Sequence, residues 1–260
     1  MTATRLPAWL RFAAPVAVGL LGLALWFAYV ASGSAPRMLP DPLAIAGELT
    51  GRMPLVAEAA AITGTNALVG LVAGSVVAVA LAALAATWRP VDGMTAPLIA
   101  ALAVVPIVAL TPILNTMFGA SSQFGRQAVA GIAAFVPVFV NALRGLQQTR
   151  PVQRDLFRAT AANGSQTFRL LTLPTALPYL LTGIRVAASL AVISALVAEY
   201  FGGPADGIGT AIATYAKSGR ASLAWAFVAG GIAIGLVFFL VTSLLERVVS
   251  RRLGAGRPPA

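Results

Sequence analysis

Apolar runs close to 20 residues long recur along the whole chain, with short polar stretches between them. A helix needs about 20 apolar residues to cross a hydrocarbon core of about 30 Å. Lipid offers no partners to backbone polar groups, and these runs are too long and continuous for barrel strands, so helices are expected. The chain is therefore predicted to be an all-α integral membrane protein with about six transmembrane helices, at about 12–31, 61–86, 95–114, 127–143, 176–198 and 225–245.

The composition agrees with a membrane protein and removes most kinds of enzyme. Only 10% of the 260 residues are charged, whereas soluble domains carry about 25%. The chain has no cysteine and no histidine, which excludes disulfides, thiolate chemistry, histidine zinc sites and Ser-His-Asp triads. Its polar stretches are too short for an independent core. We expect one transmembrane domain over residues 1–260, with a core at 60–248, and no metal or cofactor bound by this chain.

The cations are distributed unevenly between the two sides of the membrane. If both termini are cytoplasmic, twelve of the 18 Lys and Arg residues face the cytoplasm and five face outside, Arg126 among the five. Such an excess is typical of the cytoplasmic side. The net charge of +10 is thus explained without a nucleic acid partner. We expect a multi-pass protein of the cell (inner or plasma) membrane, in contact with lipid, with both ends in the cytoplasm.

Two features near the N-terminus bear on the first span. The stretch "YVASGSA" offers small residues for signal-peptide cleavage, but the apolar run before it is longer than a typical signal h-region. We therefore expect the span to be retained. In the following loop, Asp41-Pro42 suits a helix start, with Asp41 as N-cap and Pro42 at the first position. A short amphipathic helix at the membrane interface should follow.

The segment from Arg150 to Val186 is polar and basic at first, then apolar around two prolines. Residues 153–161 contain no helix breaker, and Leu156 and Phe157 give this predicted helix a narrow apolar face. We expect the helix to end near Gly164, which can take a positive φ. A second short helix, capped by Ser165, should run to about residue 171 and stop at Leu173-Pro174. The residues alone allow either a solvated loop on the membrane surface or a docking element for a soluble partner.

The sequence "RDLFRATAANGSQTFRLLTLPTALPYLLTGIRVA" resembles the cytoplasmic EAA loop of binding-protein-dependent ABC importer permeases. That pattern is E-A-A-x-x-x-G followed by I-x-L-P. Here Leu171-Thr172-Leu173-Pro174 matches its end, Asp155 takes the Glu place and Ala161 the Gly place, while Leu156 and Phe157 replace the two alanines. "VVPIVALTPILNTMFG", "VAEYFGGPADGIG" and "MLPDPLAI" are similar to the nitrate/sulfonate/taurine branch, so the likeness covers about residues 39–247.

The resemblance implies the permease subunit of a type I ABC importer with the MetI-like fold and a cytoplasmic coupling helix between spans 4 and 5. Such permeases work in pairs, here expected as a homodimer, with an ABC ATPase subunit on each EAA loop and an extracytoplasmic solute-binding protein. The chain lacks a G-x-x-x-x-G-K-[ST] loop, so it is expected to be non-catalytic, with ATP and Mg²⁺ on the partner ATPase. The coupling residues would be Arg154, Asp155, Leu156, Phe157, Arg158, Ala159, Thr160, Ala161, Ala162, Asn163 and Gly164.

The transported solute would be a nitrate-, sulfonate- or taurine-type anion, or a pyrimidine- or riboflavin-type vitamin or precursor, as in similar permeases. Arg185 lies inside span 5, where a cation lines a cavity, finds a partner or reaches the membrane edge. Glu199 is expected either at the exposed interface or in an outer gate with Tyr200 and Phe201. Polar residues in spans line a path or bond between helices. The candidate pathway residues are Thr111, Asn115, Asn141, Arg185, Ser189 and Glu199.

Two other classes of membrane protein fit the sequence less well. A secondary transporter or channel not coupled to ATP would be expected to carry intramembrane acids and paired cations, which are nearly absent here. An intramembrane enzyme would need catalytic groups that the composition lacks. ATP dependence of uptake separates the first interpretation from both. Two small-xxx-small pairs, Gly70/Gly74 and Gly231/Gly235, predict close helix packing, within the chain or between two copies.

Overall fold

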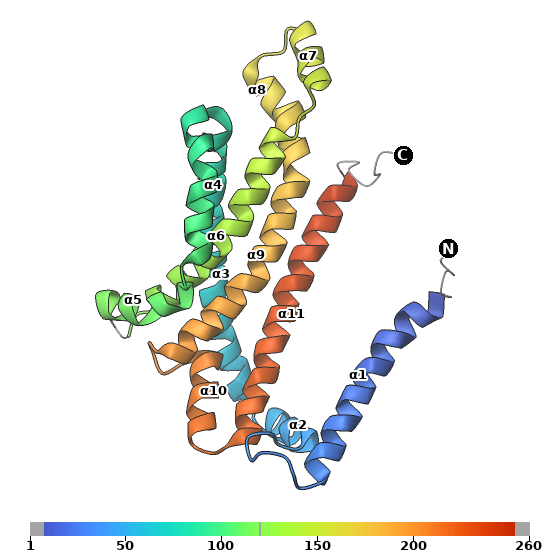
Figure 1. Cartoon of the computed structure of the whole chain (residues 1–260), viewed down its shortest axis with the longest axis vertical. Helices are drawn as coiled ribbons and strands as arrows, with labels where there is room; N and C mark the ends of the chain where they lie inside the picture. The colour runs from blue at the N-terminus through green and yellow to red at the C-terminus, as the bar shows by residue number, and fades with distance from the viewer. Residues whose placement is uncertain (1–7, 120, 253–260) are drawn as a thin grey trace.

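The computed structural model describes residues 8–119 and 121–252, and every regular element in those ranges is a helix. Figure 1 shows an elongated bundle of roughly parallel and antiparallel helices. The elements are α1 (Ala8–Ala31), α2 (Pro42–Gly51), α3 (Met53–Thr87), α4 (Arg89–Val104), a 3₁₀ turn (Ile107–Leu110), α5 (Thr111–Phe118), α6 (Phe124–Gln147), α7 (Pro151–Ala159), α8 (Gly164–Thr167), a π turn (Phe168–Thr172), α9 (Leu173–Phe201), α10 (Gly207–Lys217) and α11 (Ala221–Arg252).

Five helical segments of the described chain are long and apolar enough to cross a membrane. They contain five of the six predicted spans, or nearly all of each. The segments are Ala13–Ala31, Met53–Thr87, Phe124–Gln147, Gly164–Phe201 and Ala221–Arg252. The expected all-helical membrane fold is therefore confirmed.

The predicted third span, 95–114, is not one helix. It divides at Val105, which is extended with φ −67° and ψ 123° and ends α4. Pro106 explains the break, since a proline pushes the preceding residue out of the helical region. α4 runs back alongside α3, whereas α5 turns aside after the 3₁₀ turn (Figure 1). The return passage is thus made by a short helix followed by a bend.

Helices α3, α6 and α9 form the core, and small side chains let them approach closely. A Cβ at Gly70 would lie 2.6 Å from the Ala130 Cβ, and one at Gly74 would lie 2.2 Å from the Gly131 carbonyl oxygen. The predicted close packing at Gly70 and Gly74 is therefore confirmed, and it occurs between α3 and α6 of one chain. The buried core residues include Ala67, Ala78, Ala130, Ala134, Val138, Ala187, Ala191 and Ala195.

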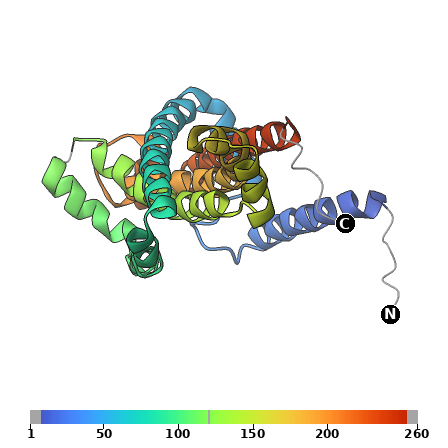
Figure 2. The same cartoon turned by 90° about the horizontal axis from the view of Figure 1, so that it is seen from above.

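Helix α1 stands away from the bundle (Figures 1 and 2), and its apolar span has no buried residue. One end of it is held by two tryptophans. The Trp26 and Trp225 rings lie 5.3 Å apart. Trp26 Nε1 donates to the Pro40 carbonyl at 3.2 Å, and Trp225 Nε1 donates to that of Met38 at 2.9 Å. Residues 38–40 therefore join α1 to α11, just before α2.

The predicted start of α2 is confirmed. Pro42 is its first residue, and the Asp41 Oδ1 accepts a hydrogen bond from the Leu43 N–H at 2.7 Å. This bond satisfies one of the backbone donors that a helix start leaves free.

Candidate functional site

Helix α7 and the turn after it project beyond the end of the bundle (Figure 1). The helix carries exposed apolar side chains, with Val152 79% and Leu156 62% exposed, while Phe157 is half-buried. Asp155 and Arg158 form an exposed ion pair of 3.3 Å beside them. Val152 and Leu156 are one helical turn apart, so they share a face. The part of the chain that the structure describes leaves this apolar face uncovered.

The turn after α7 differs from the prediction. Gly164 does not take the positive φ expected of it; Ala161 does, at +53°. Gly164 instead begins α8, and the cap is Asn163 rather than Ser165. The Asn163 side chain accepts from the Gln166 N–H at 2.9 Å, while the Gln166 side chain accepts from the Asn163 N–H at 2.8 Å. This reciprocal pair is a capping box, which fixes the helix start at residue 164.

The second helix does not stop at Leu173-Pro174 either. The Leu173 N–H donates to the Phe168 carbonyl, five residues back, so the helix widens into a π turn over 168–172. The wider turn places Pro174 at the beginning of α9, where a missing N–H is tolerated. The result is one uninterrupted helical segment from Gly164 to Phe201. The turn that follows α7 is therefore joined directly to the fifth long span.

Ala161→Gly should stabilise the turn after α7. A left-handed conformation costs an L-residue about 1 kcal/mol, which glycine does not lose. The free energy of unfolding of the purified protein should therefore rise by up to about 1 kcal/mol, while Ala159→Gly, in the last turn of the helix, should lower it. Denaturant titration of both variants measures the difference. A fall for Ala161→Gly would show that residue 161 does not hold this conformation in solution.

The predicted coupling residues form one continuous structure. Residues 154–159 lie in α7, Thr160 is its C-cap, residues 161–163 make the turn and Gly164 opens α8. The Arg154 Nε donates to the Thr149 Oγ1 at 2.6 Å, which fixes the start of α7 to the end of α6. An exposed amphipathic helix fixed at both ends is suited to contact a partner.

Among the candidate pathway residues, Arg185 forms an ion pair with Glu246. Its Nη1 lies 2.8 Å from the Glu246 Oε2, and the Thr182 Oγ1 donates to the Glu246 Oε1 at 2.6 Å. Both partners of Glu246 lie on α9, and Glu246 itself lies on α11. The pairing alternative for Arg185 is the one observed. These contacts tie α9 to α11 inside a span, where polar side chains otherwise lack partners.

A double-mutant cycle measures the Arg185–Glu246 pair. Arg185→Leu and Glu246→Leu should each lower the free energy of unfolding, because each leaves the other charge unpaired. The double variant should recover part of the loss, with a coupling energy of about 1 kcal/mol. The same cycle on the exposed Asp155–Arg158 pair should give a coupling of about 0.3 kcal/mol. Equal coupling in the two cycles would contradict a special role for the intramembrane pair.

The other candidates lie in separate places. Thr111 and Asn115 are buried on α5, and neither Oγ1 of Thr111 nor Oδ1 of Asn115 has a hydrogen-bond partner among the described residues. Asn141 donates to the carbonyl of Pro137 on its own helix at 2.8 Å. Ser189 lines an apolar groove of about 480 Å³ between α9, α10 and α11. The structure therefore does not bring these residues into one site within a single chain.

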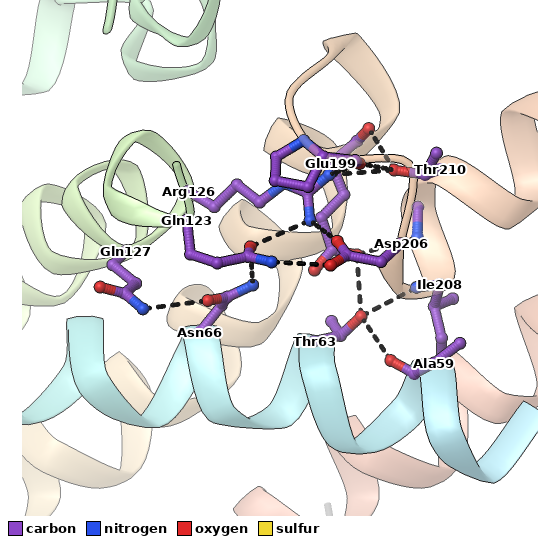
Figure 3. A network of polar contacts seen from close by, with 12 residues as sticks. Ala59, Thr63, Asn66, Gln123, Arg126, Gln127, Glu199, Asp206, Ile208 and Thr210 are labelled. Atoms are coloured by element: carbon purple, nitrogen blue, oxygen red, sulfur yellow. Dashed lines mark hydrogen bonds and ion pairs between the residues drawn. The ribbon is translucent and has the colours of Figure 1, made fainter. Parts of the chain in front are cut away.

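Glu199 belongs to a buried polar cluster, which we call the Arg126 cluster (Figure 3). Arg126 and Thr63 are fully buried and Glu199 is 1% exposed, so of the two alternatives for Glu199 the exposed interface position is wrong. Arg126, counted above among the outward-facing cations, lies in the first turn of α6, and its side chain is out of contact with solvent. The members are Thr63 and Asn66 of α3, Gln123 before α6, Arg126 of α6, Glu199 of α9, and Asp206 and Thr210 around the start of α10.

The guanidinium group of Arg126 is the centre of this cluster. Its Nη1 forms an ion pair with the Asp206 Oδ1 at 2.5 Å and donates to the Gln123 Oε1 at 3.1 Å. Its Nη2 donates to the Thr210 Oγ1 at 3.1 Å and to the Pro204 carbonyl. Planar guanidinium groups suit several acceptors at once. The arginine thus fastens the segment between α9 and α10 to the start of α6.

Two glycines let this segment fold over Glu199. Gly207 has φ +81°, and a Cβ there would lie 2.6 Å from the Glu199 Cδ. A Cβ at Gly209 would lie 2.0 Å from the Leu196 carbonyl oxygen. The Gly-rich stretch "FGGPADGIG" was the one sequence signal for a close approach here.

Both the sequence and the fold of the chain are similar to those of known transport proteins. Residues 70–255 match the model of the family described as binding-protein-dependent transport system inner membrane component. The chain is 31% identical over 193 residues to the formylaminopyrimidine transport permease protein ThiX of Halalkalibacterium halodurans, covering 72% of this chain and 75% of that protein. It is 29% identical over 249 residues to the riboflavin transport system permease protein RibX of Chloroflexus aurantiacus, covering 94% and 91%.

A third relative is the putative aliphatic sulfonates transport permease protein SsuC of Bacillus subtilis, 26% identical over 81% of this chain and 72% of that protein. The fold is similar to a chain in inward-facing structures of the MetNI methionine ABC transporter. That match has a TM-score of 0.63 and 17% identity, and it covers 76% of this chain and 98% of the other. This chain therefore belongs to the binding-protein-dependent inner-membrane permease family of ABC importers.

Proposed function

We propose that α7 is the surface on which a separate ATP-hydrolysing subunit docks, and that its movement is passed to α9. The observation that carries this proposal is the exposed apolar pair, Val152 and Leu156, on a helix projecting from the bundle. An uncovered apolar helix face with a charged border is a common recognition surface for a groove. The unbroken helical segment from Gly164 to Phe201 then supplies a stiff connection into the membrane.

The same proposal places both termini and α7 in the cytoplasm. In Figure 1, α7 and the end of α11 lie toward one end of the molecule, and α1 begins about midway along it and runs toward the other end. That end carries Arg150, Arg154, Arg158, Arg169, Arg251 and Arg252, and an excess of cations favours the cytoplasmic side.

For the solute, we propose a small molecule handed over by an extracytoplasmic binding protein. The relatives are named for a formylaminopyrimidine, riboflavin, aliphatic sulfonates, taurine and bicarbonate. Small anions and vitamins or their precursors are therefore the classes to test. The pathway is proposed to form between two copies of the chain, because the candidate pathway residues share no single cavity in one copy.

Two measurements test this function. The chain has no cysteine, so single cysteines at Gln153 and Ser218 can be labelled with a membrane-impermeant thiol reagent. Residue 153 should react only after the cells are opened, and residue 218 in intact cells. The transporter, purified with its partners and placed in vesicles, should take up solute only with ATP. Labelling of residue 153 from outside, or uptake that persists without ATP, would contradict the proposal.

A further inference from the structure

The Arg126 cluster joins four segments of the chain at one end of the bundle. Arg126 reaches from α6 to the segment before α10, as described above. Glu199, near the end of α9, contacts α3 and α10. Its Oε2 accepts from the Thr63 Oγ1 of α3 at 2.8 Å and from the Gly209 N–H of α10 at 3.0 Å. The Thr63 Oγ1 in turn accepts from the Ile208 N–H at 2.9 Å. The two Thr63 bonds join residues 136 and 145 positions apart in sequence, whereas the Gly209 bond joins α10 to the preceding helix, α9.

The two halves of the cluster are themselves connected. Thr210 accepts from Arg126 and donates to the Glu199 backbone carbonyl at 3.1 Å. Gln123 donates to the Asp206 Oδ2 at 2.8 Å and accepts from Asn66 at 2.9 Å. Arg126 Nε and Glu199 Oε1 have no partner among the described residues. The other polar atoms named here are linked across the four helices, and hydrogen bonds to charged groups out of water are strong. The ends of α3, α6, α9 and α10 are therefore expected to move as one body.

Helix α9 has one end in this rigid body and the other end at the turn after α7. Helix α9 packs along α6, whose beginning lies in the same rigid body. A push at the far end of α9 would therefore tilt these two helices together about the held end. The contact from Arg185 of α9 to Glu246 of α11 would carry that tilt to a third helix. In hinge movements a few residues absorb the change in backbone direction, while the packed parts on either side move as rigid bodies.

We propose that Arg126 is a positioning residue which, with Asp206 and Glu199, makes the fixed point about which α9 tilts during transport. The inference rests on the proposed function, in which a partner acts on α7. The cluster would not touch solute. It would prevent α9 from sliding along its neighbouring helices, so that movement of α7 changes the opening of the pathway.

Thr63 offers the cleanest test, since its hydroxyl both donates to Glu199 and accepts from Ile208. Thr63→Val removes both bonds at almost constant volume, and Thr63→Ser restores the hydroxyl. Thr65→Val is the matched control, because Thr65 is exposed on the same helix and bonds only its own helix, at the Ala61 carbonyl. Arg126→Lys is a second variant that keeps the charge and loses the planar group.

In the assembled transporter in vesicles, solute taken up per ATP hydrolysed is the readout. We expect this ratio to fall about tenfold in Thr63→Val and Arg126→Lys, as for the loss of one hydrogen bond to a charged group. Thr63→Ser and Thr65→Val should keep the wild-type ratio. An unchanged ratio in Thr63→Val would overturn the proposal.

Spin labels provide a second readout, in which one of the two comparisons needs no change within the cluster. Glu58 of α3 and Thr214 of α10 are exposed residues that line a cavity of about 240 Å³ beside Asp206. The distance between labels at these positions should stay the same in nucleotide-free and ATP-bound wild-type transporter, and widen on binding ATP in Thr63→Val. A wild-type distance that changes through the cycle would overturn the fixed point while leaving docking on α7 intact. Failure of docking would instead appear as loss of the ATPase from the complex.

Discussion

Leu156→Asp should release the ATP-hydrolysing partner and reduce ATP-driven uptake by about a hundredfold. An apolar anchor at the centre of an interface contributes about 2–4 kcal/mol, and each 1.4 kcal/mol is about a factor of ten in affinity. Aspartate would lose that contribution and place a charge in the partner's groove. Leu156 is 62% exposed in the chain by itself, so the change should alter the permease's own stability by no more than about 0.5 kcal/mol.

Leu43→Asp is the matched control for this experiment. Leu43 is 69% exposed on α2, another short helix outside the long spans. The same chemical change there should leave the ATPase bound. Co-purification of the ATPase with the permease, measured as a ratio of the two subunits, separates loss of docking from loss of expression. A wild-type ratio in Leu156→Asp would show that α7 is not the docking surface.

Phe157→Asp, which the sequence suggests equally, would be harder to interpret. Phe157 is half-buried, and its carbonyl accepts the Ala162 N–H at 3.0 Å in the turn after α7. A charge at this position would disturb the turn as well as the partner contact. The structure therefore selects Leu156 as the position at which docking can be tested alone.

The long spans were predictable because a single property, the length of an apolar run, determines them. The prediction of one helix over 95–114 was wrong because hydropathy carries no information on backbone geometry, and Pro106 bends the chain inside an apolar run. The same limit explains the turn after α7. Glycine at residue 164 suggested a positive φ there, but the capping box between Asn163 and Gln166 makes Gly164 a helix start.

The Arg126 cluster could not be predicted, for a different reason. Counting cations gave Arg126 only a side of the membrane and no partner, since its partner Asp206 lies 80 residues further along the chain. Arg185 and Glu246 are similarly distant, and the sequence left pairing as one of several alternatives. Which charges are buried depends on which helices pack together. The local pattern gave only the glycines that make such packing possible.

Gly74→Ala should cause a large loss of stability for a single methyl group added to the core. The new Cβ would lie 2.2 Å from the Gly131 carbonyl oxygen and 3.0 Å from its Cα. These are backbone atoms of α6, which cannot rotate away as a side chain would. Overpacking of this kind costs about 3 kcal/mol, and membrane helices that meet at small residues have little else to hold them together.

Gly235→Ala makes the same chemical change where nothing lies within 4 Å of the new Cβ, in the middle of α11. Alanine is a better helix former than glycine by about 1 kcal/mol, so this variant should be as stable as the wild type or more so. Unfolding in mixed micelles with increasing denaturing detergent gives both values on one scale. Because the two variants share any effect of helix propensity, their difference isolates the contact between α3 and α6. Equal stability of the two would mean that these helices do not meet at Gly74 and Gly131.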